Sequence, residues 1–391
     1  MSVTLIHNIG TLIPGPADAA PIRDCSIVIE DGVITSIAGD HPSPDVVIDA
    51  NGLDAIPGLI DGHVHPTAGE WTPAQDSIGW ISNYVHGGTT SFVSAGELHF
   101  PGLAFEELTP RTIKSVAFTS RDVTARTSPL GARIHAGTPL LVPGLTEDDF
   151  DEFAAAGISL VKFIFYDWDN LPSGEAAQYV EWSRTRGIVV KVHSGGVSRS
   201  GSSRLTGYDI LKSLEPDVVA HISGGPIPMP DEEILRVIDD LPGAFIEVCS
   251  SMNYRATKLA VEHMAENGCL DRLVLGTDTP GGTGVIPRGM LRNICYLASV
   301  CGISPTEAIA AGTANTARAH GIDGGILEVG APGDLILAGP IRGSRASNVL
   351  ECFALGDLPG ISQVLIGGRP AFPGRSQQTP PPARLARLRG F

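Results

Sequence analysis

Eight short apolar runs recur between residues 58 and 324, and segments of helical character separate them. Strands that alternate with helices predict βα units and a parallel sheet. Eight units over roughly 270 residues match a closed (β/α)8 barrel, which typically needs about 250 residues. The sequence therefore predicts an α/β chain with a TIM-like barrel at its centre. The runs are 59–65, 91–95, 133–141, 158–166, 188–193, 218–222, 244–249 and 273–278.

Both ends of the chain have the character of short strands joined by turns. Asp31-Gly32 separates two apolar runs, which is a strong hairpin signal. Further strands are predicted near the far end, at 331–338 and 361–369. We expect the two ends to pair into one composite β-sandwich domain, made of residues 1–57 and 325–391, beside a barrel domain of residues 58–324.

The composition of the chain argues against nucleic acid and membranes as binding partners. The net charge of −16 argues against nucleic acid, because phosphate binding needs a basic surface. No apolar run is long enough for a membrane span, and no signal peptide is recognisable at the N-terminus. The six cysteines are scattered without a CxxC pair, which predicts reduced thiols. We expect a cytoplasmic protein that acts on a small molecule, with neither nucleic acid nor membrane as partner.

Polar side chains stand where several of these runs end. His63 and His65 are two residues apart, so on a strand they point to the same side and can bind one metal ion. His193, His221 and Asp278 each end a later run. A single strand histidine is more often structural, but active sites of barrels lie at the C-terminal strand ends, where all of these residues fall. The set predicts a metal centre.

Lys162 lies within the fourth run and has two interpretations. It is either an ordinary cation paired with Asp167 or Asp169, or a buried amine. Burial makes loss of the proton easier, and the free amine can take up carbon dioxide to give a carbamate whose two oxygens bridge two metals. We favour the carbamate.

Imidazoles and carboxylates suit two divalent ions, zinc first, with iron, manganese, nickel or cobalt as alternatives. We expect His63, His65 and Asp278 to bind one ion, His193 and His221 the other, and Lys162 to bridge them. Such a pair would hold a bridging hydroxide that attacks a carbonyl, and Asp278 would move the proton to the leaving nitrogen. This chemistry predicts hydrolysis of an amide or cyclic amide.

The run Pro57–His65, together with the later ligand candidates, resembles the amidohydrolase superfamily of metal-dependent hydrolases. A closer resemblance is to its enamidase branch, which implies that the substrate is a small cyclic amide such as a lactam, enamide or imide. Lys162 stands where enamidases carry a bridging glutamate, as a lysine does in hydantoinases and dihydroorotases. The superfamily also implies a homo-oligomer, a dimer or tetramer. The segments that carry the closer resemblance are 86–90, 94–96, 99–102, 193–196, 201–203, 221–226 and 282–287.

Four residues are candidates for binding the substrate. Arg199 and Arg204 follow the fifth run, and a guanidinium binds a carboxylate through two hydrogen bonds. Tyr166, in the aromatic segment after Lys162, and His99 are the other two.

Two other functions remain open. A mononuclear deaminase of the same superfamily would keep the HxH pair, a histidine and Asp278, but it often carries His-x-x-Glu after the fifth strand. No such pattern occurs near His221. A non-catalytic scaffold would have lost a ligand, and no candidate ligand is missing.

Overall fold

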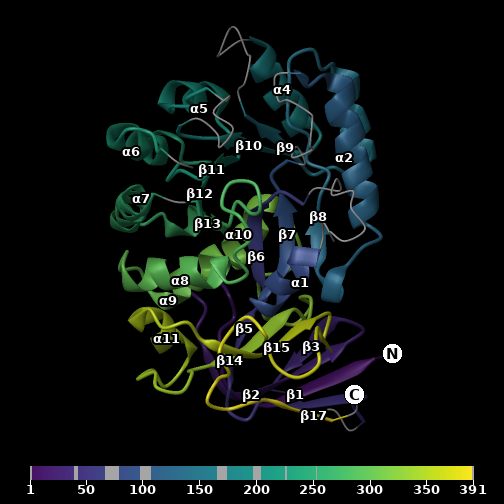
Figure 1. The fold of residues 1–391 in the computed structure, drawn as a ribbon, viewed down its shortest axis with the longest axis vertical. Helices are drawn as coiled ribbons and strands as arrows, with labels where there is room; N and C mark the ends of the chain where they lie inside the picture. The colour runs from purple at the N-terminus through teal and green to yellow at the C-terminus, as the bar shows by residue number, and fades with distance from the viewer. Residues whose placement is uncertain are drawn as a thin grey trace.

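The computed structural model describes residues 2–38, 43–66, 79–96, 107–164, 174–196, 204–224, 227–251 and 253–389. Two regions follow each other along its long axis: parallel strands surrounded by helices, and a sheet built from both ends of the chain (Figure 1).

All eight predicted central strands are present. They are β6 (Leu59–Val64), β7 (Thr89–Ser94), β8 (Arg133–His135), β9 (Leu160–Phe163), β10 (Val189–His193), β11 (Val218–Ala220), β12 (Phe245–Cys249) and β13 (Leu273–Gly276). Strands β13-β12-β11-β10-β9 form one sheet and β6-β7-β8 another, and every pairing is parallel.

Isolated parallel bridges connect these two sheets on both sides. Leu140, after β8, pairs with Lys162 of β9, and Thr279, after β13, pairs with Val64 of β6. The α/β architecture is as predicted. The sheets do not form one continuous eight-stranded ladder, so the closed (β/α)8 barrel stays a prediction.

Helices lie around the parallel strands, and the last helix of the chain lies beside the terminal sheet (Figure 1). They are α1 (Gly79–His86), α2 (Pro110–Thr124), α3 (Glu147–Ala155), α4 (Gly174–Thr185), α5 (Tyr208–Leu214), α6 (Asp231–Asp240), α7 (Tyr254–Glu266), α8 (Gly289–Ser299), α9 (Pro305–Ala311), α10 (Ala314–His320) and α11 (Val349–Leu355), with short 3-10 turns at Pro129–Gly131 and Leu270–Arg272. No helix in the described ranges is long and apolar enough to cross a bilayer.

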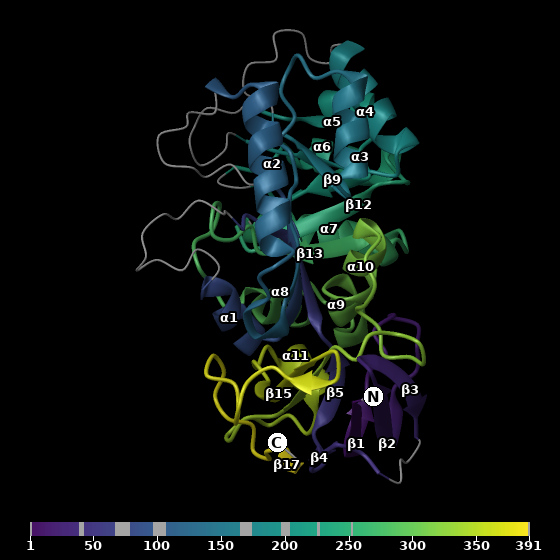
Figure 2. The same cartoon turned by 90° about the vertical axis from the view of Figure 1, so that its right-hand side faces the viewer.

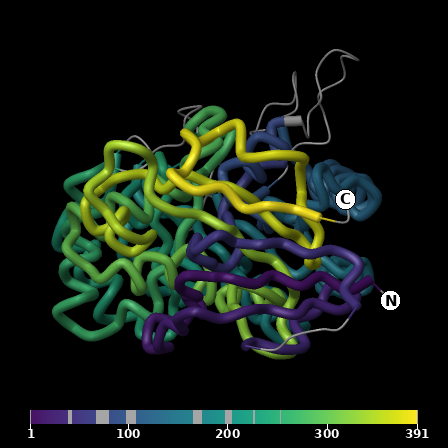
Figure 3. The backbone as a smooth tube through the Cα atoms, turned by 90° about the horizontal axis from the view of Figure 1, so that it is seen from below, coloured from purple at the N-terminus to yellow at the C-terminus, as the bar shows by residue number. Residues whose placement is uncertain are grey.

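The two ends of the chain share one nine-stranded sheet. The chain's first strands join its last through β5 and β14, which run antiparallel, and the colours of both ends lie side by side in Figures 2 and 3. The predicted hairpin forms β2 and β3 around Asp31-Gly32. The β-sandwich and the exact domain limits stay predictions. The strands are β1 (Val3–Leu12), β2 (Ile22–Glu30), β3 (Val33–Ile37), β4 (Val46–Asp49), β5 (Asp54–Pro57), β14 (Leu335–Gly339), β15 (Gly360–Ile366), β16 (Arg369–Pro370) and β17 (Arg387–Arg389).

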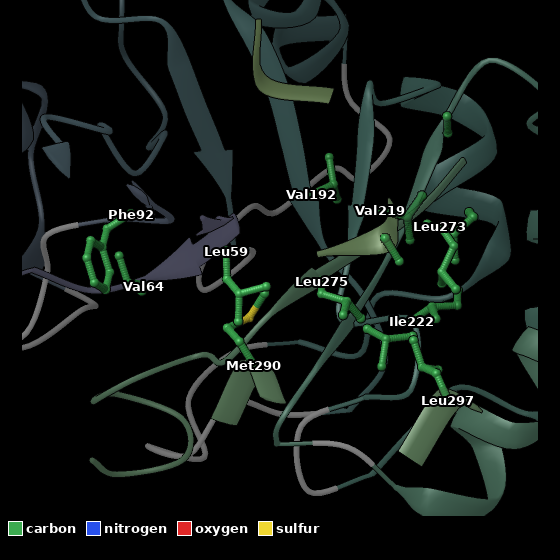
Figure 4. Close-up of a cluster of buried hydrophobic side chains, with 14 of the residues drawn as sticks. Leu59, Val64, Phe92, Val192, Val219, Ile222, Leu273, Leu275, Met290 and Leu297 are labelled. Carbon is green, nitrogen blue, oxygen red and sulfur yellow. The ribbon is translucent and has the colours of Figure 1, made fainter. Parts of the chain in front are cut away.

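Side chains of the parallel strands point alternately to two faces, and each face packs against a different apolar cluster. Val190 and Val192 of β10 point to the large apolar cluster shared with the helices, part of which Figure 4 draws with Met290 and Leu297 of α8. Val189, on the other face of β10, packs with small apolar clusters that include Ala317 and Ala319 of α10. These clusters close the N-terminal end of the strands, so the polar residues gather at the C-terminal end.

An ion pair joins the two regions. Asp334, just before β14, is almost fully buried and accepts hydrogen bonds from Arg133 of β8 through Nε at 2.8 Å and Nη2 at 3.1 Å. It also accepts one from the Gly367 amide at 2.6 Å. Three donors on one carboxylate tie β8, β14 and the turn after β15 together.

We expect Asp334→Ala to lower the free energy of unfolding by about 1 kcal/mol, because the partly exposed Arg133 guanidinium and the Gly367 amide lose their shared acceptor. Chemical denaturation measures the change. Glu328→Ala, at an exposed position, should stay within about 0.5 kcal/mol of the wild type. Equal stability of both variants would contradict the assigned role of the ion pair.

Candidate metal centre

The HxH pair and Asp278 meet at the C-terminal end of the parallel strands. The Nε2 atoms of His65 and His63 lie 3.0 Å and 3.5 Å from Oδ1 of Asp278, and the two imidazole centroids are 5.3 Å apart. Their potential ligand atoms all lie within 4.8 Å of one another. All three side chains are buried. This is the separation that one shared cation requires.

Local backbone brings these residues together. The amide of Asp278 donates to the His63 carbonyl at 2.8 Å, and the His65 amide donates to the Thr279 carbonyl at 2.7 Å. Gly276 leaves the room that His63 needs, because an added Cβ there would lie 2.4 Å from the His63 Cβ. The segments after β6 and β13 are thus held side by side.

His193 and His221 lie next to this group. Their ring centroids are 4.6 Å apart, and His221 is 5.3 Å from the ring of His63. The Nε2 of His193 lies 2.9 Å from the Gly196 carbonyl, while Nδ1 of His221 has no hydrogen-bond partner among the described residues. A buried ring nitrogen without a partner is uncommon, and it leaves a lone pair free for a ligand.

The three histidines are held neutral. Burial, together with the charge of Lys162, lowers the pKa of His63 to about 3 and that of His193 to about 4. Burial, then the nearby His193, lowers the pKa of His221 to about 3. Neutral imidazoles are the form that binds metals.

Lys162 is fully buried, and its Nζ has no hydrogen-bond partner in the described part of the chain. Its backbone forms a parallel bridge with Leu140, after β8. Burial lowers the pKa of Lys162 to about 8, although the charges of Glu247 and Asp278 oppose the shift. The buried-amine interpretation is therefore favoured. Asp167 and Asp169, the partners of the alternative, lie outside the described residues.

Asp278 is ionised despite its burial. Burial alone would raise its pKa, but the hydrogen bond from His65 lowers it below the usual range. The loop that follows folds over the carboxylate, because the amides of Gly282 and Thr283 donate to the Asp278 carbonyl at 2.8 and 3.1 Å. Asp278 itself has a φ of 59°, in the left-handed region.

Three buried charged residues of this centre were not among the sequence-based candidates. Glu247 of β12 lies 2.6 Å from both Nδ1 of His63 and Nζ of Lys191, which belongs to β10. Asp61 accepts from the amide of Thr277 at 2.8 Å and its hydroxyl at 2.5 Å. Asp61 and Lys191 each lie two residues before a ligand candidate on the same strand. A charge at that spacing inside an apolar run is the signal that could have identified them.

Of the four substrate-binding candidates, Arg204 alone lies within the described residues. His99, Tyr166 and Arg199 lie outside the described residues. Arg204 is exposed, two residues before Thr206, which forms an antiparallel bridge with Gly195 after β10. Arg204 therefore stays near the mouth of the centre as a candidate only.

Known enzymes resemble this chain in sequence and in structure. The model of the amidohydrolase family matches residues 55–370. Enamidase from Eubacterium barkeri is 37% identical over 99% of this chain and 100% of its own length. A crystal structure of enamidase matches with a TM-score of 0.88 and 35% identity over 99% of this chain and 100% of that chain. An adenine deaminase from Ruegeria pomeroyi is 26% identical over 81% of this chain and 51% of its own length.

Gly282 gives a test of the loop over Asp278. An added Cβ at Gly282 would lie 1.8 Å from Oδ2 of Asp278, so Gly282→Ala must displace one of them. We expect a loss of activity on the order of a hundredfold, the effect of a displacement of about 1 Å at a reacting group. Steady-state kinetics with a far-ultraviolet circular dichroism spectrum measures the loss against retained folding.

Gly243→Ala is the matched control, because an added Cβ there meets no atom within 4 Å. It should keep wild-type activity. Normal turnover by Gly282→Ala would mean that the loop accommodates a methyl group without moving Asp278.

Proposed function

The chain belongs to the amidohydrolase family, and on this basis we propose that it is a binuclear metal-dependent hydrolase that opens a small cyclic amide. The single observation that carries the proposal is the buried group of His63, His65 and Asp278. In the same centre, a nitrogen of Lys162 and one of His221 have no partner among the described residues. We further propose that residues 58–324 close into a (β/α)8 barrel, that residues 1–57 and 325–391 form a β-sandwich, and that the protein is a homo-oligomer.

The residues fit two divalent cations. His63, His65 and Asp278 would hold one, and His193 with His221 would hold the other. Neutral imidazoles with a carboxylate suit zinc first, with iron, manganese, nickel or cobalt as alternatives. The two unpartnered nitrogens support this proposal, since a buried polar atom without a partner is costly unless a ligand meets it.

Lys162 would bridge the cations as a carbamate. Its neutral amine would attack the carbon of carbon dioxide, forming a C–N bond as one C=O π bond opens. Loss of one amine proton to water would leave a carbamate whose carbon, bonded to Nζ, carries two oxygens that share one negative charge. Complete burial and a pKa lowered to about 8 support the availability of the neutral amine.

When bound, the cations would supply an activated water and polarise the substrate carbonyl. Asp278 is the residue of this chain that moves the proton. As an ionised carboxylate it accepts a proton from the attacking water and returns it to the leaving nitrogen as the C–N bond breaks. Its hydrogen bond to His65 and the loop through Gly282 fix the position of the carboxylate.

The substrate class comes from the likeness to enamidase, whose name denotes an enamide as its substrate. We propose a lactam, enamide or imide. Arg199, Arg204, Tyr166 and His99 are proposed to bind it, with the two arginines as partners for a substrate carboxylate. A panel of lactams, cyclic imides and dihydropyridinones tests the class, with ring opening followed by loss of ultraviolet absorbance. Turnover of none of them would overturn the cyclic-amide proposal.

A mononuclear deaminase is the second candidate function. Adenine deaminases among the relatives favour it. The group of His63, His65 and Asp278 also favours it, because these three side chains lie close enough to bind one cation. Elemental analysis separates the two functions: two metals per chain support the proposal above, and one metal with ammonia release from an aminopurine supports the deaminase. A chain that binds no metal would be a scaffold.

We expect Lys162→Ala to abolish turnover and to lower the metal content, because the bridge is lost. Short carboxylic acids added with metal should restore part of the activity by supplying the missing oxygens. Elemental analysis and steady-state kinetics measure both effects. Lys212→Ala, at an exposed lysine, is the control and should behave as the wild type. A crystal structure of the metal-loaded protein with a plain ammonium at Lys162 would refute the bridge.

We expect Asp278→Asn to retain at least one metal and to lose on the order of a thousandfold in kcat. The amide oxygen can still act as a ligand, but an amide cannot accept and return a proton near neutral pH. Metal analysis together with kcat measures the two roles separately. If the variant keeps both metals and near-normal kcat, another residue moves the proton.

A further inference from the structure

A fully buried ion pair lies directly beneath the metal-ligand candidates. Nζ of Lys191 lies 2.6 Å from Oε2 of Glu247, and both side chains are completely inaccessible. Lys191 also donates to the Gly62 carbonyl at 2.6 Å. The pair therefore connects β10, β12 and β6, the strands that carry or adjoin the histidines.

The second oxygen of Glu247 contacts both halves of the centre. Oε1 lies 2.6 Å from Nδ1 of His63 and accepts from the backbone amide of His221 at 3.2 Å. The thiol of Cys249 lies 3.5 Å from the same oxygen. His221 has a φ of 36°, so its backbone is in the left-handed region that a residue with a Cβ rarely adopts. The carboxylate thus holds one ring and one strained backbone at once.

The charge of Lys191 decides the state of this carboxylate. Oε2 of Glu247 accepts a hydrogen bond from Lys191 and Oε1 accepts one from the His221 amide, so both oxygens of the carboxylate act as acceptors. An ionised carboxylate only accepts hydrogen bonds, so Nδ1 of His63 must carry the proton. Its Nε2 then keeps a lone pair, directed at Asp278.

Glu247 could also be considered as a ligand itself, since its carboxylate lies close to His63 and Cys249. Three features argue against a cation there. Lys191 places a positive charge 2.6 Å from the carboxylate, Oε1 is already engaged by His63 and His221, and burial raises the pKa of Cys249, which keeps the thiol protonated.

We infer that Glu247, charge-balanced by Lys191, is a positioning residue that sets the tautomer of His63 and the backbone of His221 for metal binding. The inference rests on the proposed metal centre. Carboxylates that orient metal-bound histidines typically contribute ten- to a hundredfold in metal affinity.

Glu247→Gln is the first variant. Lys191 has only donors, so the amide oxygen of the glutamine must face it, and the NH2 group then faces Nδ1 of His63 and the amide of His221. His63 is forced to carry its proton on Nε2, where it cannot bind a metal. We expect zinc affinity, measured by chelator competition on the metal-free protein, to fall by about ten- to a hundredfold.

The double variant Lys191→Met/Glu247→Gln distinguishes a role of Glu247 in positioning His63 from a role in balancing the charge of Lys191. Without Lys191 the glutamine can turn its oxygen to His63 and restore the required tautomer. We expect the double variant to bind zinc on the order of tenfold more tightly than Glu247→Gln. It should also unfold at a higher temperature than the single variant Lys191→Met, because that variant leaves a buried carboxylate unpaired. The absorption spectrum of the cobalt-loaded proteins should return toward the wild type in the double variant.

Asp54→Asn is the matched control, because it also removes a buried carboxylate that accepts from a backbone amide, at Val349, but lies in the terminal sheet. It should leave zinc affinity unchanged. Zinc affinity of Glu247→Gln within twofold of the wild type, or no gain in the double variant, overturns the inference alone. A wild-type protein that binds no zinc overturns the proposed function and the inference with it.

Discussion

The burial of charge at one end of the parallel strands is the constraint on which the rest of the centre depends. An ionised side chain removed from water is strongly unfavourable unless opposite charge and hydrogen bonds compensate it. Glu247 meets this condition through Lys191 and His63, and Asp278 through His65. The histidines meet it by remaining neutral. Lys162 is the exception, because its nitrogen is equally buried and has no partner among the described residues.

The strands create this arrangement through their two faces. On β10, valines at 190 and 192 pack against the helices, while Val189, Lys191 and His193 follow each other on the opposite face from the closed N-terminal end to the open C-terminal end. Alternation therefore places an apolar layer, a charged layer and a ligand layer one above another. On β10, His193 therefore follows a residue that is ion-paired, Lys191, and one that is packed, Val189.

Much of this could be predicted from the sequence, because apolar periodicity directly reports strands. All eight central runs are strands, both ends of the chain share a sheet, the six cysteines are free, and the resemblance to the amidohydrolase superfamily and enamidase is confirmed. The ligand candidates are adjacent as predicted, while their metals stay a prediction. Glu247 was missed because it lies in the middle of an apolar run, and only the folded chain brings its side chain from β12 to His63 of β6. Sequence spacing carries no information on such a contact.

The burial of polar atoms also bears on whether this centre would hold one cation or two. One cation on His63, His65 and Asp278 would compensate that carboxylate and bind two imidazoles. It would leave Nδ1 of His221 and Nζ of Lys162 buried with no partner in the described ranges. Each such atom costs about 1–3 kcal/mol. Two cations with a carbamate on Lys162 would turn both liabilities into ligands, and the negative carbamate would offset the added positive charge. A binuclear centre, as proposed, would therefore leave fewer buried polar atoms without compensation than a mononuclear one.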